Sequence, residues 1–149
     1  MDISKFVVSS RMTSAAVDMC RSLGYHRIPR SHLDASRERR AFWTTYILDK
    51  AVSLRIGRTS ILQDCDISTE LPPLPPEEDQ RPWHSMYLSW ISLAKLQGRI
   101  YQDLFTVQAL ADAPEARTER AQKLVAALRL WYEDCYKVRS ISMVIEFDP

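Results

Sequence analysis

Hydrophobic and polar positions alternate with a helical period along most of the chain. Between Arg11 and Gly24 apolar side chains recur at intervals of three and four residues, which places them on one face of a helix. They are Met12, Ala15, Ala16, Met19, Cys20 and Leu23. Gly24 supplies a left-handed stop. The pattern predicts a first helix over 11–24 and an aperiodic connector over 25–33.

A second helix is predicted to begin near Asp34 or Ser36, because either side chain can cap exposed amide groups. It runs to about Ile56, and Gly57 ends it. Apolar residues lie on nearly every side of its middle part: Ala41, Phe42, Trp43, Tyr46, Ile47, Leu48, Ala51, Val52 and Leu54. The composition therefore predicts a helix that is surrounded by other elements.

The helical pattern disappears between Arg58 and Pro82. Polar residues prevail there, and the run Leu71 to Pro76 contains four prolines, which favour an extended polyproline conformation. An internal loop over 58–82 is predicted. The proline run suits a stiff linker, and a docking site for a partner is the alternative.

Two further helical patterns follow the loop. The first covers Trp83 to Leu110 as a broad buried face, and the second begins near Pro114, where Asp112 and Glu115 have the spacing of a capping box. Apolar positions of the last helix are Ala121, Leu124, Val125, Leu128, Trp131, Tyr132 and Cys135. We predict an all-α, irregular bundle of about four main helices. Residues 138–149 form a tail whose pattern fits a strand, a helix or a loose end.

Composition adds few constraints on function. The 149 residues suit one helical domain over 1–149, and a formal net charge of +1 gives no overall attraction to nucleic acid or anionic membranes. Cys20, Cys65 and Cys135 lie far apart, so a disulfide framework is not expected. Together with the absence of a long apolar run near Met1, this predicts a soluble, intracellular chain.

Candidate chemistry is sparse. The chain contains no Cys-x-x-Cys pair and no glycine-rich phosphate loop, so neither a metal nor a cofactor is expected. Cys65 lies between Asp64 and Asp66, with His84 a loop away. Flanking carboxylates raise the pKa of a thiol and make it less nucleophilic. We therefore interpret Cys65 as a small loop residue that packs inward, and we do not expect an enzyme.

The basic cluster formed by Arg37, Arg39 and Arg40 resembles a short phosphate-binding patch. Glu38 interrupts it, and no second basic stripe extends it. A solvated helix start with intramolecular ion pairs is the simpler interpretation.

Asp49 is an acid in the mostly apolar middle part of this helix. It lies seven residues after Phe42 and three after Tyr46, which places it on the aromatic side. A buried carboxylate without a partner would cost several kcal/mol. We predict a partner for Asp49, either Arg58 just after the Gly57 turn or an arginine at the start of a neighbouring helix. Exposure to solvent is the alternative.

Several spaced motifs form a distinctive series. They are Arg39-Arg40-x-Phe42-Trp43, Tyr46-x-Leu48-Asp49-Lys50, Ser53-Leu54-x-Ile56-Gly57-Arg58, Asp64-x-Asp66-Ile67 and Leu71-Pro72. The series resembles the fungal-specific transcription factor domain, the middle homology region of fungal zinc binuclear cluster regulators, over residues 12–72. The chain departs from the family pattern at Lys50, where arginine is usual, and at Thr59-Ser60, where proline is usual.

The resemblance implies part of a larger, all-helical regulatory domain of a nuclear RNA polymerase II transcription factor. It implies a signature made of Arg39, Arg40, Phe42, Trp43, Asp49, Gly57, Arg58, Asp64, Asp66 and Pro72. Protein partners, self-association or a small-molecule effector would act on such a domain. Zinc and DNA contact would belong to a six-cysteine cluster, which these 149 residues do not contain.

A function from another class is also consistent with the residues. A small helical protein of this size can bind a ligand or act as a tailoring enzyme through a pocket between its long helices. Tight metabolite binding or turnover that requires Cys65 or His84 would favour this alternative.

Overall fold

The computed structural model describes residues 3–29 and 35–145, with side chains described within 7–29 and 35–136. Within these ranges the chain has five α-helices, three short 3-10 helices and no strand, which confirms the all-α prediction. It forms two compact units, residues 1–72 and residues 73–149, each described by itself. No helix of the described residues is long and apolar enough to span a membrane.

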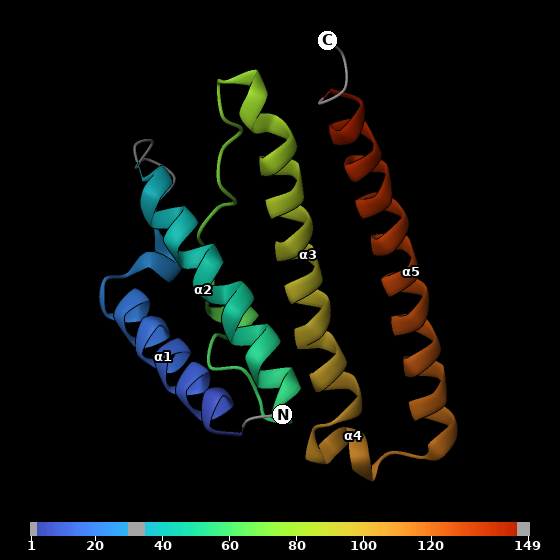
Figure 1. Cartoon of the computed structure of the whole chain (residues 1–149). Coiled ribbons are helices and arrows are strands. Elements are labelled where there is room, and N and C mark those ends of the chain that lie inside the picture. The colour runs from blue at the N-terminus through green and yellow to red at the C-terminus, as the bar shows by residue number, and fades with distance from the viewer. Residues whose placement is uncertain (1–2, 30–34, 146–149) are drawn as a thin grey trace. The chain divides into compact units, whose positions relative to one another are not determined.

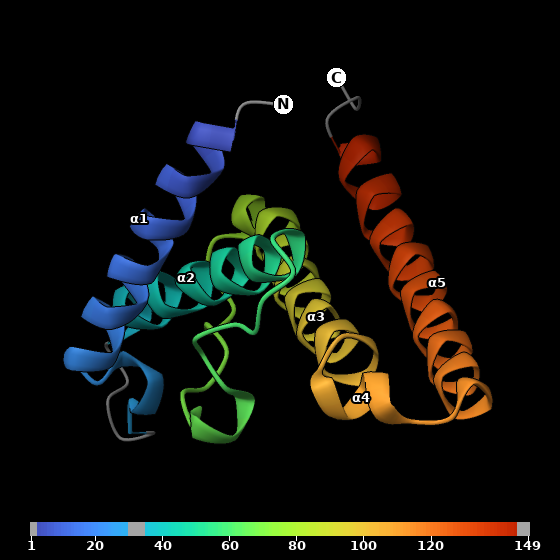
Figure 2. The ribbon, with the colours of Figure 1, turned by 90° about the horizontal axis from the view of Figure 1, so that it is seen from below.

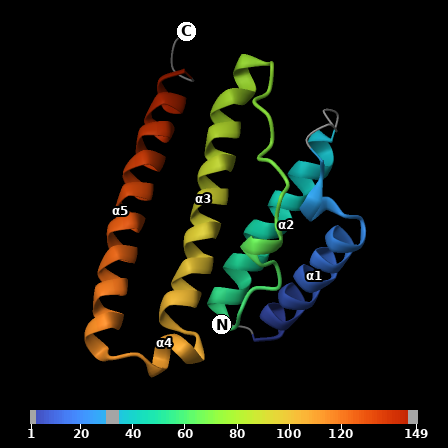
Figure 3. The same ribbon diagram turned by 180° about the vertical axis from the view of Figure 1, so that it is seen from behind.

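The first unit contains helices α1 (Ile3–Ser22) and α2 (Ser36–Arg55), which pack against each other (Figure 1). A 3-10 turn at Tyr25–Arg27 lies in the connector between them, and a second one, Asp64–Asp66, lies in the segment after α2. That segment returns along α2, as the view from behind shows (Figure 3). The buried apolar side chains of this unit are Val17, Cys20, Ile28, Phe42, Trp43, Tyr46 and Leu62.

The second unit is a helical hairpin. Helix α3 (Arg81–Leu104) packs against α5 (Pro114–Ile145), and the short α4 (Val107–Ala111) lies at the turn between them (Figure 2). A 3-10 turn at Glu78–Gln80 leads into α3. The buried apolar side chains are Ile91, Ala94, Leu96, Ala109 and Leu124.

Helix α1 differs from its prediction in both extent and orientation. It begins at Ile3, eight residues before the predicted start, and ends at Ser22. Its buried side chains are Thr13, Val17 and Cys20, whereas Met12 and Met19 are 69% and 65% exposed. The buried face is therefore shifted from the predicted apolar stripe, of which only Cys20 is buried. Thr13 is tolerated inside because its hydroxyl donates to the Ser9 carbonyl at 2.8 Å.

Helix α2 begins at Ser36, within the predicted start, while Asp34 lies outside the described residues. The residue at the cap position is Ala35, which offers no capping side chain. The prediction that α2 is surrounded was wrong, because Ala41 and Leu48 are exposed on one side. Its buried side combines aromatic residues with Arg39, Asp49 and Lys50.

The predicted helix over 83–110 is two helices. The break falls at Phe105 and Thr106, where the Thr106 side chain accepts a hydrogen bond from the Ala109 amide and starts α4. Because the chain turns there, Phe105 and Val107 are exposed instead of continuing the predicted buried stripe, and Trp90 is also half exposed. The described residues therefore contain four long helices, as predicted, together with the short α4.

Helix α5 begins at Pro114, as the sequence indicates, and it extends through most of the predicted tail to Ile145. Asp112 forms an ion pair with Arg120, which replaces the capping box expected with Glu115. Of the predicted apolar face, Leu124 is buried, whereas Val125, Leu128 and Tyr132 are exposed. Residues 146–149 of the predicted tail lie outside the described residues.

Candidate functional site: a polar lock on helix α2

The end of α2 turns the chain back toward the helix. Gly57 has φ of 70°, a conformation that glycine adopts without steric cost. The Arg58 amide donates to the Ser53 carbonyl at 3.0 Å, and the Gly57 amide donates to the Leu54 carbonyl at 3.2 Å. These two bonds form a Schellman motif. The predicted Gly57 stop is confirmed, and it directs residues 58–72 along the buried face of α2.

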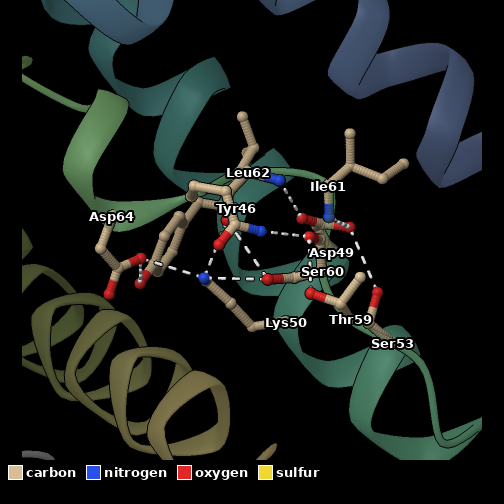
Figure 4. A network of polar contacts seen from close by, with 10 residues as sticks. Tyr46, Asp49, Lys50, Ser53, Thr59, Ser60, Ile61, Leu62 and Asp64 are labelled. Atoms are coloured by element: carbon tan, nitrogen blue, oxygen red, sulfur yellow. Dashed lines mark hydrogen bonds and ion pairs between the residues drawn. The ribbon is translucent and has the colours of Figure 1, made fainter. Parts of the chain in front are cut away.

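Asp49 holds the first part of the returning segment. Its side chain is 0% exposed, which confirms its predicted burial. Its Oδ2 accepts a hydrogen bond from the Leu62 amide at 2.8 Å, and its Oδ1 accepts one from the Ile61 amide at 3.2 Å (Figure 4). The Ser53 hydroxyl also donates to Oδ1, at 3.3 Å. Backbone N–H groups therefore satisfy the buried carboxylate.

Lys50 holds the next part of the segment. Its side chain is 4% exposed, and its ammonium donates to the Ser60 hydroxyl at 3.0 Å and to the Leu62 carbonyl at 2.8 Å. It also pairs with Oδ1 of Asp64 at 3.0 Å. Three donors thus meet three oxygens, so the buried cation is fully hydrogen-bonded.

Tyr46 completes the arrangement. Its hydroxyl donates to Oδ1 of Asp64 at 2.9 Å, and its ring lies 5.1 Å from the Lys50 ammonium. Burial raises the pKa of the Tyr46 hydroxyl, and the charge of Asp64 raises it further. We call the side chains of Tyr46, Asp49, Lys50, Ser60 and Asp64, with the backbone of Ile61 and Leu62, the polar lock.

The aromatic residues of α2 extend the attachment beyond the polar lock. The Trp43 indole N–H donates to the Glu70 carbonyl at 2.9 Å. Its ring contacts Phe42 edge to face at a centroid distance of 5.3 Å, and Tyr46 at 5.2 Å. Residues nearer the start of α2 therefore bind residues farther along the loop: Lys50 binds Ser60, Tyr46 binds Asp64, and Trp43 binds Glu70.

The loop also binds the connector between α1 and α2. The Ser68 and Thr69 amides donate to the His26 carbonyl at 3.0 and 3.2 Å. The buried Thr69 hydroxyl accepts from the Ile28 amide at 3.0 Å and donates to the Tyr25 carbonyl. Residues 57–72 are thus fixed on both sides, although they contain only one short 3-10 turn.

The polar lock has the chemistry of a structural site. Asp49 and Lys50 are buried, and their polar atoms are engaged by the partners described above. The raised pKa of Tyr46 keeps its hydroxyl protonated as a donor. No group of three or more metal-ligating side chains occurs among the residues that the structure describes. The arrangement holds a loop in place, and its largely exposed charged group, Asp64, with a side chain 54% exposed, is engaged by Lys50 and Tyr46.

The predicted signature residues fall into several environments. Asp49 and Asp64 both belong to the polar lock, Trp43 binds Glu70, and Phe42 and Pro72 are buried. Arg39 is buried and Arg40 is exposed, so the solvated helix start applies to only part of the basic cluster. Asp66 forms a largely exposed ion pair with Arg27 at 3.5 Å.

Two predictions about individual residues were wrong. Arg58 does not pair with Asp49, because its guanidinium donates to the Ser14 hydroxyl at 3.4 Å, toward α1. Cys65 is exposed instead of packed inward. The 3-10 turn at Asp64–Asp66 directs Asp64 toward Lys50, and the next side chain along it is left in solvent.

Sequence reasoning missed Tyr46, Lys50 and Ser60 as members of the site. A signal was available for the first two, because Tyr46 lies three residues before Asp49 and four before Lys50, the spacings that bring helical side chains together, and both carry a hydrogen-bond donor. Ser60 and the amides of Ile61 and Leu62 carried no such signal, since every loop contains similar groups.

The chain is similar in sequence to a known protein family and to several of its members. The profile of the family described as "Fungal specific transcription factor domain" matches residues 7–133. The chain is 32% identical to Protein STB5 of Saccharomyces cerevisiae over 110 residues, which cover 74% of this chain and 14% of that protein. A search of solved structures found no match.

Two regulators from Aspergillus are also similar, and both are named ABC-transporter-regulating transcription factor. The Aspergillus fumigatus protein is 26% identical over 66% of this chain and 12% of its own length. The Aspergillus oryzae protein is 24% identical over 93% of this chain and 16% of its own length. The chain therefore spans a small part of each of these relatives, whose names support a role in transcription regulation.

Proposed function

Because the chain belongs to the family of fungal specific transcription factor domains, we propose that it is a regulatory region of an RNA polymerase II transcription factor, which acts in the nucleus without contacting DNA. The family match over residues 7–133 carries this proposal. It confirms the resemblance seen over residues 12–72 and extends it through both compact units.

The polar lock supports a regulatory rather than a catalytic role. Its charged groups are directed at the loop over 57–72 and are satisfied there, so they shape a surface instead of meeting a substrate. A defined surface is what a domain needs to bind partner proteins, and small-molecule effectors would act by changing that surface. We propose no cofactor for this chain, and we assign zinc and DNA contact to a six-cysteine cluster elsewhere in such a factor.

A tethering experiment tests the regulatory role. The chain is joined to a heterologous DNA-binding domain and activation domain, and transcription of a reporter is compared with that of the same fusion without the chain. We expect the chain to change reporter output and an Asp49→Asn variant to lose that effect at equal protein level. An Asp18→Asn variant, changed at an exposed position of α1, serves as the matched control.

A DNA-binding assay tests the second part of the proposal. The purified chain is incubated with a pool of random duplexes, with and without zinc. We expect no sequence-specific complex under either condition. Specific, zinc-dependent binding would contradict the proposal, as would unchanged reporter output in the tethering experiment.

A further inference from the structure

Helix α5 carries a second apolar stripe beside the face that packs on α3. Leu124 is buried and the Trp131 indole N–H donates to the Ser89 carbonyl at 2.9 Å, which defines the α3 side. The second stripe follows at spacings of three and four residues, and its members are 41–65% exposed. They are Val125, Leu128, Tyr132 and Tyr136, and we call them the α5 stripe.

The α5 stripe is contiguous and slightly hollowed. A shallow groove of about 270 Å³ is lined by Leu128, Arg129, Trp131, Tyr132 and Glu133. Helical spacing places these four-residue neighbours, Arg129 and Glu133, on the same side of the stripe. A contiguous exposed apolar surface bordered by charge is typical of a protein-binding surface.

The order of the two charges indicates what covers the α5 stripe. In two parallel copies the twofold axis runs along the helices and places the Arg129 and Glu133 side chains of the two copies on opposite sides of the interface, so they do not pair with each other. Two antiparallel copies bring Arg129 of one copy toward Glu133 of the other, twice by symmetry. The charge pattern is therefore complementary to itself in the antiparallel arrangement.

The spacing of the apolar residues fits the same arrangement. Pairing Val125 with Tyr136 of the second copy centres that pair between residues 130 and 131, and pairing Leu128 with Tyr132 centres the other on residue 130, so the two registers differ by half a residue. In these registers Arg129 and Glu133 of the two copies differ by about 2–3 Å along the helix axis, given a rise of about 1.5 Å per residue. Long side chains span that offset easily.

We propose that two copies of this chain associate through antiparallel α5 stripes, with Arg129 and Glu133 forming reciprocal ion pairs. Covering the four apolar side chains and the two charges removes on the order of 500–600 Å² from each copy, at the lower limit of specific interfaces. The association is thus expected to be reversible. It goes beyond the regulatory role proposed above and does not depend on it.

Charge reversal tests the proposal directly. Arg129→Glu and Glu133→Arg each create like charges across the interface, so each variant should dissociate at least about tenfold more readily than the unchanged chain. An equimolar mixture of the two variants restores both ion pairs and should regain the dimer. Sedimentation velocity at tens of micromolar protein measures the three states, and Asp18→Arg serves as a control on α1 that changes the net charge as Glu133→Arg does.

The two variants change exposed positions, and circular dichroism melting checks that each keeps its helices. Single variants that dissociate and a mixture that reassociates would support the proposal. An unchanged chain that sediments as a monomer would overturn it, and would mean that another polypeptide segment covers the α5 stripe. Variants that dimerise like the unchanged chain, or a mixture that stays monomeric, would also overturn it.

Discussion

Oδ2 of Asp49 accepts a hydrogen bond from the Leu62 backbone amide at 2.8 Å, across 13 positions of sequence. The bond joins the middle of α2 to a segment with almost no regular secondary structure of its own. A fully buried carboxylate binds backbone N–H groups more strongly than a neutral acceptor does. The loop over 57–72 therefore depends on α2 for its conformation.

Lys50 and Ser60 should be energetically coupled, because the ammonium donates to the hydroxyl at 3.0 Å. Lys50→Met removes the buried charge and takes one hydrogen-bond donor from each of the three oxygens around it, which should destabilise the chain by about 1–3 kcal/mol. Ser60→Ala should cost less. A double-mutant cycle by urea unfolding should give a coupling energy of at least about 0.5 kcal/mol, whereas strictly additive losses would argue against the contact.

Thr69 should be sensitive to loss of its hydroxyl but not of its methyl group. Thr69→Val keeps the shape and leaves the buried Ile28 amide without its acceptor, so it should cost about 1–3 kcal/mol. Thr69→Ser retains the hydroxyl and should cost clearly less. Chemical denaturation compares the pair, and equal losses in the two variants would show that packing, not hydrogen bonding, determines the effect.

Gly57 should tolerate substitution only by residues that adopt positive φ. A Cβ at this position meets no atom within 4 Å, so the cost of Gly57→Ala is conformational and should be about 1–2 kcal/mol. Gly57→Asn should cost less, since asparagine enters the left-handed region more readily. Thermal melting ranks the three proteins, and an alanine variant as stable as the original would contradict the Schellman turn.

His26 should make stability depend on mildly acidic pH. Its pKa is lowered from 6.5 by burial and by the nearby charges of Arg27 and Arg21, while Asp66 acts in the opposite direction. Its Nδ1 is shielded from solvent and has no hydrogen-bond partner. The unfolded chain therefore binds this proton more readily, and folding loses stability as pH falls below about 6.5.

A His26→Gln variant removes that titration. Its free energy of unfolding should fall less steeply with decreasing pH than that of the unchanged chain over the same range. Urea unfolding at several pH values between neutrality and about pH 5 measures the difference. Parallel pH profiles, or a steeper one in the variant, would contradict the effect.

The sequence predicted the helices better than it predicted their faces. Periodicity located α2 and α5 well, because their apolar positions and flanking signals agree. On α1 the more apolar stripe containing Met12 and Met19 is exposed, and the stripe centred on Val17 is buried. Periodicity reports that a helix has an apolar side, but packing against α2 selects which side is covered.

The part of the candidate site that depends on a distinctive side chain was predictable from the sequence. An acid on the aromatic side of α2 indicated a buried Asp49 that needs a partner. The sequence favoured an arginine as the partner of Asp49, yet the carboxylate accepts hydrogen bonds from the amides of Ile61 and Leu62. Backbone donors are identical at nearly every residue, so only the three-dimensional path of the loop could reveal them.

The polar lock holds the loop over 57–72 on α2 through Asp49. Hydrogen exchange of the Ile61 and Leu62 amides, measured by NMR in the unchanged chain and in Asp49→Asn, tests this role of the carboxylate. The asparagine side chain cannot accept from both amides, so exchange should accelerate at least about tenfold at these two positions while amides in the middle of α3 keep their rates. Equal protection of Ile61 and Leu62 in the two proteins would contradict the claim.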